Sequence, residues 1–118
     1  MIAGAHADSV LLAHMGECLA RIADYTQNQR LTFTSSIQVQ DAAIRNIQIL
    51  TESSQRLSAV IKLTEPPVPW RELAGFRNAS VHGYLGIDLD AIWLVIGRGL
   101  PPLAEAVQRM ALRCPAKG

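Results

Sequence analysis

The chain has 118 residues, of which 49% are hydrophobic, and its formal net charge is +1. This length fits one domain, and only two each of Trp, Tyr and Phe argue against an aromatic-rich β-sandwich. The near-neutral charge excludes a global field that attracts nucleic acid, so any contact with RNA has to come from a local patch. The longest apolar stretch, around Trp93, is far shorter than a membrane span, and no stretch resembles a secretory signal. We therefore expect a cytoplasmic protein without a membrane segment.

A first helix is expected over residues 7–27. The apolar residues of its buried face recur at steps of four and three: Leu11, Met15, Cys18, Ile22 and Tyr25. Asp8 is expected to cap its N-terminus, because an aspartate side chain can accept from the free N–H groups of a first turn. The polar stretch 26–34 lacks this period and is predicted to be a connection.

A longer second helix is predicted from about Ser36 to Lys62. Its apolar stripe has the same period: Ala43, Ile47, Leu50, Ser54, Leu57 and Ile61. Two such stripes imply near-antiparallel packing of the bundle type. The helix has to stop before Pro66 and Pro67, because proline cannot donate a helical hydrogen bond and disfavours helix just before it.

The C-terminal half predicts three further helices. Pro69 suits the first position of a third helix, which Gly83 would end in a left-handed cap. Asp88 would cap a short fourth helix. Two glycines and two prolines are expected to break that helix before the last one begins near Leu103: Gly97, Gly99, Pro101 and Pro102. The sequence thus predicts an all-α fold, an up-and-down bundle of four to five helices, as a single domain over residues 1–118.

The most informative stretch is R-N-A-S-V-H-G-Y, from Arg77 to Tyr84. An arginine followed by a histidine five residues later occurs by chance in about one chain in ten of this length. Adding the asparagine and the tyrosine lowers this to about one in ten thousand. Neither Cys18 nor Cys114 belongs to a metal-ligand spacing, so no metal site is predicted.

This run, with P-W-R-E-L-A-G-F before it (69–76), resembles the HepT branch of the HEPN superfamily. Q-D-A-A-I-R-N (40–46), G-I-D-L (86–89) and L-P-P-L (100–103) are similar to further signatures of the family. The resemblance implies an HEPN fold and a ribonuclease toxin of a type VII toxin–antitoxin system. In that family the arginine and histidine of the motif, here Arg77 and His82, cut RNA without a metal or another cofactor.

The resemblance also implies partners. A MNT-type nucleotidyltransferase would be the antitoxin and would silence the toxin by attaching AMP to the motif tyrosine, Tyr84. The family's two-fold dimer, with two motifs facing each other in one cleft, implies a homodimer here and a larger complex with the antitoxin. A nucleotidyltransferase encoded beside this chain would support that expectation.

The chemistry of these side chains fits the cleavage of RNA. His82 can give or take a proton near neutral pH, and Arg77 can hold a phosphate with its fork of donors. Asn78 is a supporting residue that would orient His82 or hold a phosphate oxygen. Positions 77 and 82 lie about 140° apart around a straight helix, so they do not share a face. Either the chain leaves the helix near His82, or two motifs combine across a dimer.

Each of these residues also has a structural interpretation. Arg77 and His82 could simply bond helix-end carbonyls, and Tyr84 could be a packed aromatic. Trp70 and Trp93 are expected to anchor the core or an interface rather than stack on bases. The alternative function is a non-catalytic helical module that binds a nucleotidyltransferase partner. Growth arrest that survives Arg77→Ala and His82→Ala would favour this second function.

Overall fold

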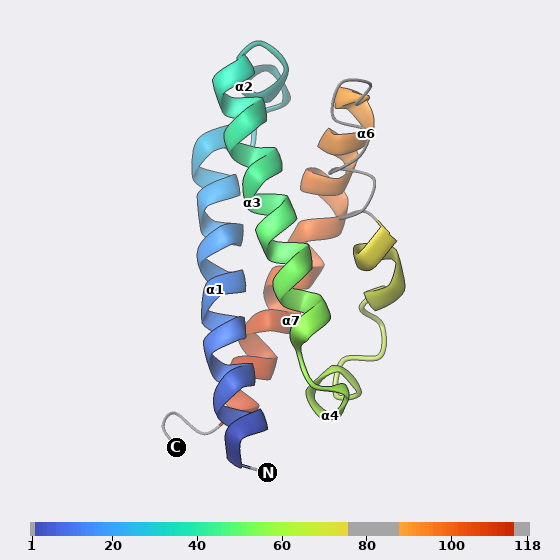
Figure 1. The fold of residues 1–118 in the computed structure, drawn as a ribbon. Coiled ribbons are helices and arrows are strands. Elements are labelled where there is room, and N and C mark those ends of the chain that lie inside the picture. The colour runs from blue at the N-terminus through green and yellow to red at the C-terminus, as the bar shows by residue number, and fades with distance from the viewer. Residues whose placement is uncertain (1, 76–87, 115–118) are drawn as a thin grey trace.

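The computed structural model describes residues 2–75 and 88–114. The fold is all-α, and the described residues contain no strand (Figure 1). Residues 70–75 form a helix at the end of the first described range. The other helices, in chain order, are α1 (Ile2–Thr26), α2 (Arg30–Thr34), α3 (Ile37–Arg56), α4 (Ala59–Lys62), α6 (Leu89–Leu94), η2 (Val95–Gly99) and α7 (Leu100–Arg113).

Three long helices, α1, α3 and α7, lie side by side and bury the core between them (Figure 1). The predicted stripe of the second helix is buried throughout, and that of the first is buried except at the half-buried Tyr25. α7 adds Leu103, Val107 and Met110 to the core. The apolar period therefore identified the packed faces. No described helix is both long and apolar enough to cross a membrane.

The start of α1 corrects the sequence prediction. The helix begins at Ile2, so Asp8 lies inside it and does not cap its N-terminus. The carboxylate of Asp8, on a residue only 6% exposed, instead accepts hydrogen bonds from the N–H of Ser58 at 2.9 Å and from its hydroxyl at 2.6 Å. The side chain of Ser58 in turn accepts from Ile61 N–H at the start of α4. Asp8 thus ties α1 to α4, across 50 residues of sequence.

The connection after α1 contains a helix that the sequence pattern did not predict. α1 ends at Thr26, and Gln27 and Asn28 take positive φ values of 54° and 55°, which reverse the chain. The short helix α2 follows. Its Phe33 is fully buried and stacks on Trp93 with the ring centroids 5.7 Å apart. Burial of one aromatic ring, rather than helical periodicity, explains why this polar stretch folds.

The predicted second helix is two helices. α3 ends at Arg56, and Leu57 takes an extended conformation with ψ of 146°. Ser58 is extended as well, and caps α4 while it bonds to Asp8. Because the helix breaks here, Ser58 can bond both to Asp8 and to the N–H of Ile61. Leu57 and Ile61 are buried, as predicted.

The C-terminal third confirms one prediction and corrects another. Asp88 caps α6, since its carboxylate accepts from the N–H groups of Asp90 and Ala91 at 3.0 and 3.4 Å. The expected break at the glycines and prolines is wrong, because α6, η2 and α7 follow one another without leaving helical geometry.

The physical reason lies in the prolines, Pro101 and Pro102, which have no N–H to donate to carbonyls one turn earlier. The chain widens into the π-helix η2 at that point, and Leu100 N–H donates to the carbonyl of Val95, five residues back. The prolines then occupy the first turn of α7, where no donor is needed.

Candidate active site

All four predicted site residues lie outside the described residues: Arg77, Asn78, His82 and Tyr84. Their mutual geometry is therefore a prediction from the sequence. The structure describes the framework on both sides of the motif. The described residues end at Gly75 and resume at Asp88.

On the side that precedes the motif, helix 70–75 is held by its first residue. The indole Nε1 of Trp70 donates to the carbonyl of Glu65 at 3.3 Å, and its backbone N–H donates to Val68 at 2.9 Å. Leu73 N–H donates to the carbonyl of Pro69 at 3.0 Å, which starts the helix where the sequence predicts it. Trp70 is half-buried and packs against the core, as predicted. The helix that leads into the motif is thus anchored at its N-terminus.

On the side that follows the motif, α6 is held against α2. Trp93 stacks on Phe33, and Arg30 forms an exposed ion pair with Asp90. Together with the cap at Asp88, these contacts fix the point at which the chain re-enters the described fold. Trp93 is a core anchor, as the sequence predicted.

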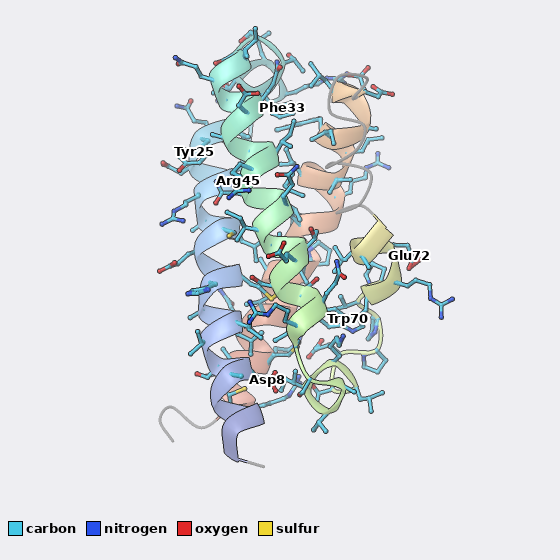
Figure 2. The ribbon with its side chains drawn as sticks, in the orientation of Figure 1. Asp8, Tyr25, Phe33, Arg45, Trp70 and Glu72 are labelled. Carbon is cyan, nitrogen blue, oxygen red and sulfur yellow. The ribbon has the colours of Figure 1, made fainter. Side chains whose placement is uncertain are left out.

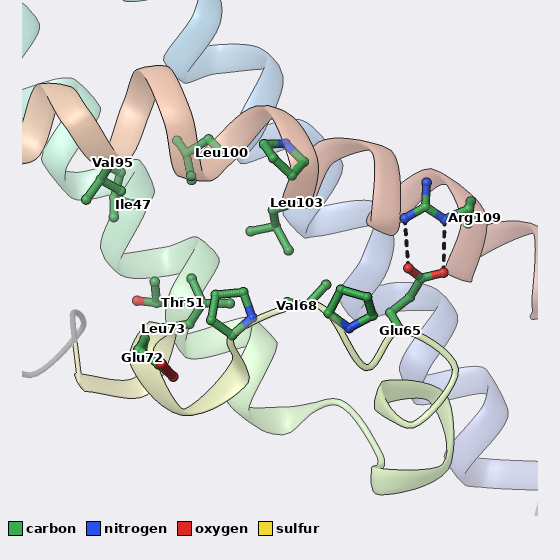
Figure 3. Close-up of a pocket in the computed structure, with 14 residues that line it drawn as sticks. Ile47, Thr51, Glu65, Val68, Glu72, Leu73, Val95, Leu100, Leu103 and Arg109 are labelled. Atoms are coloured by element: carbon green, nitrogen blue, oxygen red, sulfur yellow. Dashed lines mark hydrogen bonds and ion pairs between the residues drawn. The ribbon is translucent and has the colours of Figure 1, made fainter.

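A cluster of one glutamate and two arginines lies beside Trp70. Glu65 is 5% exposed, and Arg109 of α7 donates two hydrogen bonds, of 3.0 and 2.8 Å, to its carboxylate (Figure 3). Arg113 adds a third at 2.6 Å and also bonds the hydroxyl of Thr64 at 3.0 Å. Hydrogen bonds from Arg109 and then Arg113 lower the pKa of Glu65 to about 2, so the carboxylate is charged at any physiological pH. The same contact raises the pKa of Arg109.

A cavity of about 370 Å³ separates helix 70–75 from α3 and α7 (Figure 3). Its walls are mostly apolar, with Leu73 on one side and Ile47, Leu100 and Leu103 on the other. The Glu65–Arg109 pair lies at one end.

Four residues outside the motif, with reactive or polar side chains, are either buried in the fold or exposed on its surface. Burial raises the pKa of the Cys18 thiol, which fits inert packing. His14 and Arg45 are exposed, and Arg45 is labelled on α3 in Figure 2. Asn46 is buried and donates to Ala42 at 2.9 Å, while its Oδ1 has no hydrogen-bond partner among residues 2–75 and 88–114. Within residues 2–75 and 88–114, no three His, Cys, Asp or Glu side chains gather to hold a metal ion.

Comparison with known proteins agrees with the motif. A family model described as "Ribonuclease HepT-like" matches residues 15–110, a range that includes the motif. The "Probable ribonuclease HepT" of Thermococcus cleftensis is 27% identical over 100 residues, which are 84% of this chain and 91% of that protein.

Two proteins of Methanocaldococcus jannaschii are also similar. One, named "Gamma-glutamylcyclotransferase and putative RNase", is 31% identical over 103 residues, 86% of this chain but 46% of its own length. The chain therefore spans less than half of that relative. The other, named "Putative RNase", is 30% identical over 76 residues, 64% of this chain and 70% of that protein. No solved structure matches the chain.

Proposed function

Because the chain belongs to the HepT-like ribonuclease family of the HEPN superfamily, we propose that it is a metal-independent endoribonuclease whose catalytic residues are Arg77 and His82. The observation that carries this proposal is the R-N-x-x-x-H-x-Y run inside the range that the family model matches. The framework supports it, because the described residues before the motif, 70–75, form a helix anchored at Trp70.

The proposed reaction uses the nucleophile that RNA itself carries. The ribose 2′-hydroxyl attacks the adjacent phosphorus, its proton leaves to a base, and the bond to the 5′-oxygen breaks as that oxygen gains a proton. His82 moves a proton in this exchange, and Arg77 stabilises the charge that develops on the phosphate. Asn78 supports the pair. The products are a 2′,3′-cyclic phosphate and a 5′-hydroxyl.

The test is cleavage of a labelled RNA by the purified protein with EDTA present. Arg77→Ala and His82→Ala are each expected to lower the rate by at least about 100-fold. The matched controls are Arg21→Ala and His14→Ala, which remove exposed side chains of the same kinds from α1 and should keep activity. A product with a 3′-hydroxyl and a 5′-phosphate would refute the chemistry. Full activity in either motif variant would refute the assignment of that residue.

The biological role that we propose is a toxin of a type VII toxin–antitoxin pair, acting in the cytoplasm as a homodimer. Its antitoxin would be a MNT-type nucleotidyltransferase, which forms a larger complex with the toxin and attaches AMP to Tyr84. A bulky anionic adduct two residues from His82 would block the site and compete with RNA for Arg77.

The chain offers a direct control for this modification, because Tyr25 and Tyr84 are its only two tyrosines. With the cognate nucleotidyltransferase and labelled ATP, Tyr25→Phe should take up label and Tyr84→Phe should not. Label on Tyr84→Phe would refute the assigned position. Growth arrest that persists in both Arg77→Ala and His82→Ala would favour the non-catalytic binding module instead.

A further inference from the structure

Glu65 bonds to two parts of the molecule, through its carboxylate to α7 and through its backbone carbonyl to Trp70. Its carboxylate is fixed to α7 by three hydrogen bonds from Arg109 and Arg113. Its carbonyl accepts from the indole of Trp70 and, at 3.2 Å, from Val68 N–H. One residue thus connects the C-terminal helix to the first residue of helix 70–75.

Helix 70–75 packs against the core through Trp70 and Leu73, but a pocket also borders it. The cavity of about 370 Å³ lies between Leu73 and the facing side chains of α3 and α7. Protein interiors are normally close-packed, so an element bordered by such a space can shift more easily than one in full contact. Lys62 lies over the Trp70 ring at 6.0 Å and adds only a weak cation–π contact. The hydrogen bond from Trp70 to Glu65 is therefore one restraint on where this helix starts, beside the core packing of Trp70 and Leu73.

We propose that Glu65 is a positioning residue for RNA cleavage: clamped by Arg109 and Arg113, it fixes the helix that precedes Arg77. This inference rests on the proposed function. Arg77 is the seventh residue after Trp70 and the second after Gly75, so a tilt at the start of the helix displaces Gly75, two residues before Arg77 in the sequence. Misplacement of a catalytic group by about 1 Å can cost about 100-fold in rate.

The kinetic test compares two variants that each neutralise a buried carboxylate. Glu65→Gln is expected to lower kcat about 10- to 100-fold and to change KM less, because the contacts of RNA away from Arg77 are left intact. Asp8→Asn, which weakens the buried contact with Ser58, is expected to keep kcat in the folded protein. Glu65→Asp retains the charge and should recover part of the loss. Equal kcat values in Glu65→Gln and Asp8→Asn, corrected for folded fraction, would overturn the proposal.

A second readout does not depend on catalysis. In a Trp93→Phe background, Trp70 is the only tryptophan, so its emission reports the indole bonded to Glu65. Adding Glu65→Gln should shift that emission and make it easier to quench with acrylamide, whereas adding Asp8→Asn should not. A wild-type protein without ribonuclease activity would refute the proposed function. In that case the emission of Glu65→Gln would be the remaining test of the link between Glu65 and Trp70, and an unchanged spectrum would overturn that link.

Discussion

Single residues carry the contacts that the sequence could not predict. Glu65 and Arg109 are 44 positions apart, and Asp8 and Ser58 are 50 apart. These separations are far longer than one helix, so no local sequence pattern indicates the contacts, and only the folded chain brings these groups together. By contrast, Asp88 was predicted as a cap because its partners are the next residues along the chain. The cap at Asp88 could thus be predicted from sequence, although the one predicted at Asp8 is wrong, and the buried contacts between distant segments could not.

The lowered pKa of Glu65 predicts how stability depends on pH. The unfolded carboxyl titrates near its ordinary value of 4.5 and the folded one at about 2, so protons bind preferentially to the unfolded chain. The stabilisation by Glu65 is therefore complete above about pH 5 and is lost as the pH falls towards 2. Urea unfolding between pH 2 and 6 should show the advantage of wild type over Glu65→Gln shrinking across this window. An advantage that stays constant would contradict the assignment.

At the scale of the element, periodicity predicted which faces are buried but not where helices break. The glycines and prolines between Gly97 and Pro102 predicted the end of a helix. The chain instead forms a π-helix, in which a backbone hydrogen bond spans five residues rather than four, and continues as α7. Conversely, nothing marked the break at Leu57, which lies on an uninterrupted stripe. Helix ends depend on which hydrogen bonds the tertiary fold offers, and those partners are remote in sequence.

A continuous helix through η2 makes a prediction about Gly97. A Cβ added at this exposed glycine meets no atom within 4 Å, and no described glycine has a positive φ. Gly97→Ala is therefore expected to stabilise the protein by about 0.5–1 kcal/mol, because alanine loses less backbone entropy in a helix. Thermal unfolding at one protein concentration measures the effect. A lower melting temperature in Gly97→Ala would indicate that the segment needs glycine, as expected of a helix break.

For the whole molecule, the sequence predicted the fold class and the family, because both depend on patterns along the chain. The bundle, the packed faces and the anchoring roles of Trp70 and Trp93 are confirmed. The arrangement of the site stays a prediction, since Arg77 and His82 lie outside the described residues. Their separation of about 140° on an ideal helix leaves two arrangements open: one site in each subunit, or sites shared between two.

Mixing inactive subunits distinguishes these arrangements. If each site combines Arg77 of one subunit with His82 of the other, a dimer of one Arg77→Ala and one His82→Ala chain contains one intact site and one without either group. Random reassortment gives half mixed dimers, so activity should return to about a quarter of the wild-type value. Each variant mixed with itself is the control and should stay inactive. Mixed dimers that form, as shown by tagging one variant, and yet stay inactive would place Arg77 and His82 of each site in a single subunit.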